Sequence, residues 1–263
     1  MRLIQSLIVS ALVLSFGFSA YAESPEEKAF RIAKENEKAN SGFKGELSAM
    51  IMVLINAHGD KTNRKMTNFI LERDNEGDLS INEFLWPADV KGTKLLTHAF
   101  KEKSDDQWLY LPALKKTKRI SSRNKSGSFM GSEFSYEDMG SQEPEKFKWK
   151  YIEQSKMKKR DIHKMERVPT DEYSSYSKQV VYSDLEYKNP LKIEYFDKKG
   201  ELLKVAMFGP YKKLYKGIYR PMKIHIKNVQ TKKESILQWK KRKLGAKISK
   251  SKFDSTKLAG DGF

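Results

Sequence analysis

The 263-residue sequence contains no cysteine. The chain therefore cannot form a disulfide and has no thiol for lipid attachment, so its stability must come from packing. Histidine is also scarce: His58, His98, His163 and His225 lie in different segments, and no two have the spacing of a metal site or a catalytic triad. We expect no metal, no cofactor and no enzymatic activity.

Other catalytic motifs are missing as well. The serine-rich segment 127–132 has no serine centred between two glycines, so it does not match a nucleophile elbow. The neighbouring acids in Asp105-Asp106 and in Glu137-Asp138 would point apart on a strand or a helix. No glycine-rich phosphate loop with a lysine is present. These absences argue against a hydrolase.

The chain begins like an exported protein. Arg2 is followed by an apolar run over residues 3–18 and then by Ala20-Tyr21-Ala22, which is the order of a basic region, an apolar region and a cleavage site. The run is short for a membrane span, which favours cleavage over an uncleaved anchor. We expect residues 1–22 to be a signal peptide and residues 23–263 to form one soluble domain.

The chain is strongly basic, with a net charge of +17. In a cytoplasmic protein this charge would suggest nucleic-acid binding, but export argues against a nucleic-acid partner. In the cell envelope the same charge favours anionic lipid headgroups, acidic glycans or an acidic protein partner. The alternative is a solvated surface that only confers solubility.

The pattern of apolar residues predicts one helix followed by a β-rich domain. Ser24 and Pro25, with two acids behind them, mark the start of an amphipathic helix over residues 25–39 that packs on a sheet. Short apolar or alternating segments broken by turns then predict an antiparallel meander. The expected strands are residues 43–56, 64–73, 79–86, 93–101, 107–111, 116–121, 145–158, 161–169, 190–196, 201–209, 219–229 and 234–243, and residues 176–186 are ambiguous.

Residues 121–140 interrupt the meander. This insertion contains three glycines and several apolar side chains between Phe129 and Met139. We predict a short helix over residues 131–139 with flexible flanks.

Several strands are apolar on both faces, notably residues 49–55, 69–71 and 108–111. Such a sheet must be covered on both sides, and the N-terminal helix and the insertion are available as covers. An ordinary two-layer core would account for this pattern. A cavity is favoured by large adaptable side chains such as Met50, Trp86 and Phe134, because methionine and aromatic residues line surfaces that accept variable hydrophobic ligands.

The middle of the chain, residues 91–139, resembles the outer-membrane lipoprotein-sorting protein family of LolA-like carriers. The motifs that carry the resemblance are Asp106-Gln107-Trp108-Leu109-Tyr110-Leu111-Pro112, Lys118-Arg119-Ile120 and Ser128-Phe129-Met130-Gly131-Ser132-Glu133-Phe134-Ser135-Tyr136-Glu137-Asp138-Met139. The resemblance implies a mainly β (α+β) fold, an incomplete antiparallel β-barrel of about eleven strands wrapped around an N-terminal helix and a short helical lid over an apolar cavity.

The resemblance also implies a function. Proteins of this kind shield acyl chains of lipoproteins or other lipids while crossing the periplasm, so we expect a monomeric periplasmic carrier. A resistance-nodulation-division-type exporter or an outer-membrane acceptor would be its partner. The alternative is an envelope sensor or adaptor of the same fold that binds a membrane protein instead of transporting lipid.

The expected ligand-binding site is the apolar cavity. A one-residue slip in a strand would exchange the residues that face inward, so the choice of face is open. The expected lining residues are Met50, Met52, Leu54, Phe69, Leu71, Phe84, Trp86, Trp108, Tyr110, Phe129, Met130 and Phe134.

Overall fold

The computed structural model describes residues 22–74 and 76–260. The expected signal peptide, residues 1–22, lies outside the described residues except for Ala22. Within the described ranges, no helix combines the length and the apolar character needed to cross a membrane.

The N-terminal helix, α1 (Pro25–Asn40), forms as the sequence predicts. The Ser24 hydroxyl accepts a hydrogen bond from the Glu27 amide, and the Glu27 carboxylate accepts one from the Ser24 amide, which together form a capping box. The buried stripe of Ala29, Ile32 and Ala33 packs α1 against the sheet, mainly against β7 (Phe147–Met157).

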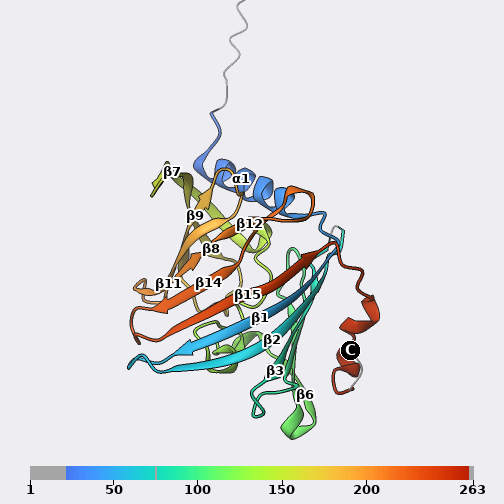
Figure 1. The fold of residues 1–263 in the computed structure, drawn as a ribbon. Coiled ribbons are helices and arrows are strands. Elements are labelled where there is room, and N and C mark those ends of the chain that lie inside the picture. Colours follow the sequence, from blue (N-terminus) through green and yellow to red (C-terminus); the bar gives the residue numbers. More distant parts are fainter. Residues whose placement is uncertain (1–21, 75, 261–263) are drawn as a thin grey trace, which may run out of the picture.

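One large antiparallel sheet follows the helix. It contains 13 strands in the order β6-β5-β4-β3-β2-β1-β15-β14-β11-β10-β9-β8-β7. The first and last strands of this order do not pair with each other, so the sheet curls into an unclosed barrel (Figure 1). The predicted fold class is confirmed.

The strands have the following bounds: β1 Gly45–Ile55, β2 Lys61–Leu71, β3 Leu79–Trp86, β4 Lys94–His98, β5 Asp106–Leu111, β6 Lys116–Ile120, β8 Arg160–Pro169, β9 Lys178–Asp184, β10 Pro190–Phe196, β11 Leu202–Phe208, β14 Lys223–Asn228 and β15 Glu234–Leu244. The expected strand over residues 219–229 is divided into β13 (Tyr219–Pro221) and β14, and β13 pairs with β12 (Tyr211–Lys213) in a separate two-stranded sheet.

The concave side of the large sheet, called the inner face below, carries the main core. Side chains from strands far apart in the sheet, such as Phe84 of β3 and Trp149 of β7, belong to one buried cluster there. The same cluster contains the buried stripe of α1 and the insertion residues Phe129 and Phe134. Both α1 and the insertion therefore cover the inner face.

The expected short helix over residues 131–139 is wrong. The structure has only a single 3₁₀ turn, Phe129–Gly131, in this part of the insertion. Met130 and Gly131 both have positive φ, at 51° and 75°, which ends the helical turn. Ser132 and Ser135 then bond nearby backbone groups and compete with helical hydrogen bonds.

The C-terminal segment covers the outer face at β3, β4 and β5, a cover that was not expected from the sequence. Short 3₁₀ turns, Lys250–Phe253 and Ser255–Lys257, lie on the outside of the sheet (Figure 1). Phe253 and Leu258 pack there in a second buried cluster with Leu79, Ile81 and Leu96. The Phe253 carbonyl also lies 2.7 Å from Nε2 of His98.

Candidate functional site

The structure divides the expected lining residues between the two faces of the sheet. The inner-face cluster contains Met50, Met52, Leu54 and Phe84 from strands and Phe129, Met130 and Phe134 from the insertion. The outer-face cluster contains Phe69, Leu71, Trp108 and Tyr110, which pack near the C-terminal segment. Trp86 lies at the end of β3 and is 49% exposed.

The placement of Phe69, Leu71, Trp108 and Tyr110 in one inner lining is therefore corrected. Successive side chains of a strand point to opposite faces of the sheet, and the pairing register decides which of them face inward. Met66 is opposite the inner-face residue Met50, so the odd-numbered Phe69 and Leu71 point outward. The inner face also contains residues that were not among the expected lining: Met66 of β2, Leu95 of β4 and Leu109 of β5.

The insertion fills the hollow of the barrel in this structure. Phe129 is fully buried, and its ring centroid lies 5.7 Å from that of Phe84 and 5.7 Å from that of Tyr136. Phe134 is 4% exposed, and Met130 and Met139 pack against the same cluster. The insertion thus occupies the place that an apolar ligand would take.

Polar contacts also hold the insertion in the barrel. Arg64 of β2 donates a hydrogen bond to the Met130 carbonyl. Asn228 Nδ2 lies 2.8 Å from Glu133 Oε2, and the Glu133 amide lies 3.0 Å from Ser235 Oγ. Lys204 Nζ lies 2.9 Å from the Glu133 carbonyl. The insertion is therefore fixed by four strands in addition to its apolar contacts.

Lys204 and Asp138 form a buried ion pair. Their side chains are 5% and 6% exposed. Asp138 also accepts hydrogen bonds from the Tyr176 hydroxyl, at 2.8 Å, and from the Ser135 amide, at 2.7 Å. A buried charge requires such compensation, so this pair ties the insertion to β11.

Lys204 belongs to a line of polar residues that crosses the inner face. The members are direct cross-strand partners on β8, β9, β10, β11 and β14. We call this line the polar row; its residues are Arg167, Gln179, Tyr195, Lys204 and Asn228. The row was not expected from the sequence, although the lone Lys204 within the apolar strand 202–208 was a local signal. The row itself depends on strand register.

Burial controls the ionisation of the polar row. Burial lowers the pKa of Arg167 to about 10, so its guanidinium stays charged at neutral pH. Its Nε donates to Gln179 Oε1 at 2.8 Å, and its Nη2 donates to Gln142 Oε1 at 2.8 Å. Burial also raises the pKa of Tyr195 above its ordinary value, which keeps the phenol neutral. The row therefore carries two cations and three neutral polar groups.

A pocket of about 460 Å³ opens beside the polar row. Gln179 and Tyr176 line it together with the insertion residues Glu137 and Asp138. Gln107 also lines the pocket; it is 1% exposed, and its Oε1 has no hydrogen-bond partner within the described residues. None of the expected apolar lining residues borders this pocket.

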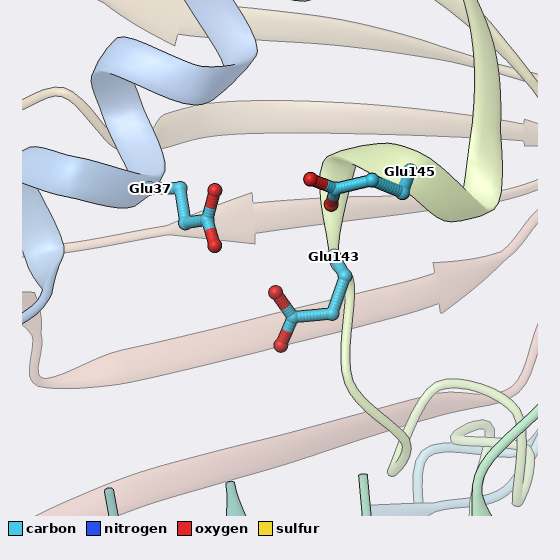
Figure 2. A group of neighbouring side chains, drawn as sticks. All are labelled: Glu37, Glu143 and Glu145. Carbon is cyan, nitrogen blue, oxygen red and sulfur yellow. The ribbon is translucent and has the colours of Figure 1, made fainter. Parts of the chain in front are cut away.

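Three carboxylates gather between α1 and the loop before β7 (Figure 2). Oxygens of Glu37, Glu143 and Glu145 lie within 4.8 Å of one another, which is close enough to hold a metal ion. However, Lys34 pairs with both Glu37 and Glu145, and Lys101 pairs with Glu37 at 3.1 Å. These ammonium groups supply the positive charge that a metal would bring, so we assign no metal to the cluster.

The cluster gives the protein a pH-dependent stability. Burial, and then the charge of Glu37, raise the pKa of Glu143 from 4.5 to about 7. Between these values the folded chain binds more protons than the unfolded chain, so the free energy of unfolding falls as the pH rises. Replacing Glu143→Gln should stabilise the protein at pH 8 by about 1–2 kcal/mol, after allowance for solvent screening, and give no gain at pH 4.

Urea unfolding at the two pH values measures this effect. The exposed Glu201→Gln is the matched control, and we expect no such pH-dependent gain from it. A loss of stability at pH 8 in the Glu143 variant would show instead that the ionised carboxylate is favourably paired.

Comparisons with known proteins place the chain in a family. A family model described as an uncharacterized protein matches residues 76–259. A crystallised domain described as an outer membrane lipoprotein-sorting protein, from Vibrio parahaemolyticus, is 40% identical, with a TM-score of 0.87, and the match covers 89% of this chain and 100% of that chain. No curated protein matches the chain.

Two further crystal structures share the fold. A DUF1329 family protein from Desulfovibrio piger is 24% identical over 89% of this chain and 99% of that chain, with a TM-score of 0.84. A LolA superfamily protein from Nitrosomonas europaea is 18% identical over 86% of this chain and 97% of that chain, with a TM-score of 0.68. The unclosed barrel is thus a LolA-like fold, and the chain belongs to the outer-membrane lipoprotein-sorting protein family.

Proposed function

We propose that this protein is a periplasmic carrier that binds acyl chains of lipoproteins or other lipids on the inner face of its unclosed barrel. The observation that carries the proposal is the insertion, an apolar segment without long helices or strands that fills the hollow. Opening of this segment exposes an apolar surface that includes Met50, Met52 and Phe84.

An acyl chain and the insertion make apolar contributions of similar size. Burial of an acyl chain contributes roughly 0.8 kcal/mol per CH₂, or about 11 kcal/mol for about 14 methylenes. Release of the insertion exposes Phe129, Met130, Phe134, Tyr136 and Met139. Each large side chain of this kind contributes about 1.5–3 kcal/mol when buried. The apolar burial lost when the insertion leaves is therefore similar to that gained from the acyl chain, which suits loading and unloading.

Residues outside the hollow fit the same function. Residues 1–22 direct export, and the basic charge of the chain favours anionic membrane surfaces. The carrier would exchange cargo with a membrane exporter of the resistance-nodulation-division type or with an outer-membrane acceptor. Binding of this kind requires no catalytic group.

A second candidate function is an envelope sensor or adaptor of the same fold. It is favoured by the packing of the insertion in the hollow, because the protein's own side chains fill the apolar part of the inner face. An adaptor would keep this packed interior and present its surface to a membrane protein.

The four tryptophans separate these functions. Trp239 and Trp149 belong to the inner-face cluster, whereas Trp108 belongs to the outer-face cluster and Trp86 is half-exposed. We would make two single-tryptophan variants, one keeping Trp239 and one keeping Trp108, with phenylalanine at the other positions. A brominated fatty acid should quench the fluorescence of Trp239 strongly and that of Trp108 little.

Lipid extraction of the purified mature chain completes the test. The carrier proposal expects stoichiometric lipid by mass spectrometry and selective quenching of Trp239. Equal quenching in both variants would place the acyl chain elsewhere on the protein. Absence of both lipid and quenching would support the adaptor.

A further inference from the structure

We propose that the polar row binds the phosphate of an anionic lipid headgroup, and that the insertion acids Glu133 and Asp138 occupy this headgroup site in the closed state. This inference rests on the proposed carrier function, because the headgroup site is exposed only when the insertion leaves the hollow. It names the cargo class as anionic phospholipid.

The acceptors that bind the Lys204 ammonium and the Asn228 amide group all come from the insertion. Asp138 pairs with Lys204, and the Glu133 carboxylate accepts a hydrogen bond from Asn228. The Glu133 carbonyl is the other partner of Lys204. These acceptors all belong to the insertion, so the wall of the barrel supplies the donors and the insertion supplies the negative charge.

When the insertion leaves the hollow, the positive charge of the polar row remains. The row contains Arg167 and Lys204 but no acid. The acids whose charges act on Arg167 are Asp138 and Glu137, and both lie on the insertion. Withdrawal of the insertion therefore leaves two cations in an apolar hollow without a counter-ion, which is costly. An uncharged acyl cargo would leave Lys204 without a counter-ion, whereas an anionic headgroup would take the place of Asp138 beside it.

The number and type of hydrogen-bond donors around Asp138 also suit a phosphate. Asp138 now binds Lys204 Nζ of β11 and the hydroxyl of Tyr176, which lies in the loop between β8 and β9. Asn228, the cross-strand partner of Lys204, adds an amide donor. Neighbouring strands lie about 4.8 Å apart, so one group can contact adjacent members of the row. An ammonium and two neutral donors fit the several acceptor oxygens of a phosphate.

The polar row lies between the apolar part of the inner face and the pocket. Val181, Ile193, Ala206 and Ile226 continue the inner face along the same strands, where acyl chains would lie. The pocket of about 460 Å³ borders the row at Gln179. A lipid with its chains on the apolar strands would thus have its phosphate at the row and space for a headgroup alcohol beside it.

The test compares two lipids with identical acyl chains, dioleoylphosphatidylglycerol and dioleoylglycerol, by their displacement of a fluorescent acyl probe from the full mature chain. The wild-type protein should prefer the phospholipid by about tenfold to a hundredfold, the range of one charge-assisted hydrogen bond. The double variant Lys204→Met with Asp138→Asn removes both charges of the pair without leaving either partner unpaired. It should bind both lipids with similar affinity.

The exposed Lys199→Met, in the turn between β10 and β11, is the matched control and should keep the wild-type preference. A double variant that keeps the full preference for the phospholipid would overturn the headgroup site, as would a wild-type protein that binds both lipids equally. Displacement by oleate as strong as that by the phospholipid would overturn the choice of phosphate.

Inorganic phosphate alone should not displace the probe, since it has no acyl chain to compete for the apolar surface that holds the probe. Displacement by phosphate alone would assign the row to a free anion instead of a lipid headgroup and would overturn the proposal. If neither lipid displaces the probe, the carrier function itself fails, an outcome distinct from equal binding of both lipids.

Discussion

A disulfide between residues 133 and 235 should abolish acyl loading. The Glu133 amide lies 3.0 Å from Ser235 Oγ, which limits the separation of the two Cα atoms to about 7 Å, near the range of natural disulfides. The variant Glu133→Cys with Ser235→Cys would carry the only thiols of the chain, because the sequence has no cysteine. Oxidation would hold the insertion in the hollow, so a fluorescent acyl probe could not enter.

Reduction of the same sample should restore loading, which separates closure from damage to the fold. Each single cysteine variant serves as a control, since neither can form the intramolecular cross-link. If the oxidised double variant takes up the probe as fast as the reduced one, the insertion is not the gate and acyl chains enter by another route.

Replacing Lys204→Met should lower the free energy of unfolding by about 3–5 kcal/mol, because it leaves the carboxylate of Asp138 buried without its cation. Methionine preserves much of the volume of lysine, so the loss reports on charge more than on packing. Urea unfolding followed by circular dichroism measures the change.

The double variant Lys204→Met with Asp138→Asn should recover more than half of this loss. Asparagine can still hydrogen-bond to the Tyr176 hydroxyl and the Ser135 amide. The coupling energy from the double-mutant cycle gives the contribution of the pair. A single variant within about 0.5 kcal/mol of wild type would mean that water already reaches the pair in the closed state.

Local chemistry made much of the fold predictable. The start of α1 follows from Ser24, Pro25 and Glu27, which act within one helical turn. The strands follow from alternation and turn residues, and short connections explain the order within β1–β6 and within β7–β11. The pairing of β1 with β15 joins distant parts of the chain. The resemblance of residues 91–139 to lipoprotein-sorting proteins then identified the unclosed barrel.

Non-local features were harder to predict. Phe69 and Phe84 look equivalent in the sequence, yet register places them on opposite faces of the sheet. The cover of the outer face depends on Phe253 and Leu258, which lie far along the chain from the strands that they contact. The polar row combines residues from five strands, so no local pattern could reveal it.

The edge strands β6 and β7 do not pair with each other, which has a mechanical consequence. A closed barrel has a circumference fixed by its hydrogen bonds. In a sheet with two unpaired edge strands, these edges can move apart without breaking any inter-strand hydrogen bond. The interior can then widen for bulkier cargo and contract around slimmer cargo. Lys116, Lys118 and Arg119 on β6 discourage a second molecule from pairing with that edge, so the flexibility need not lead to aggregation.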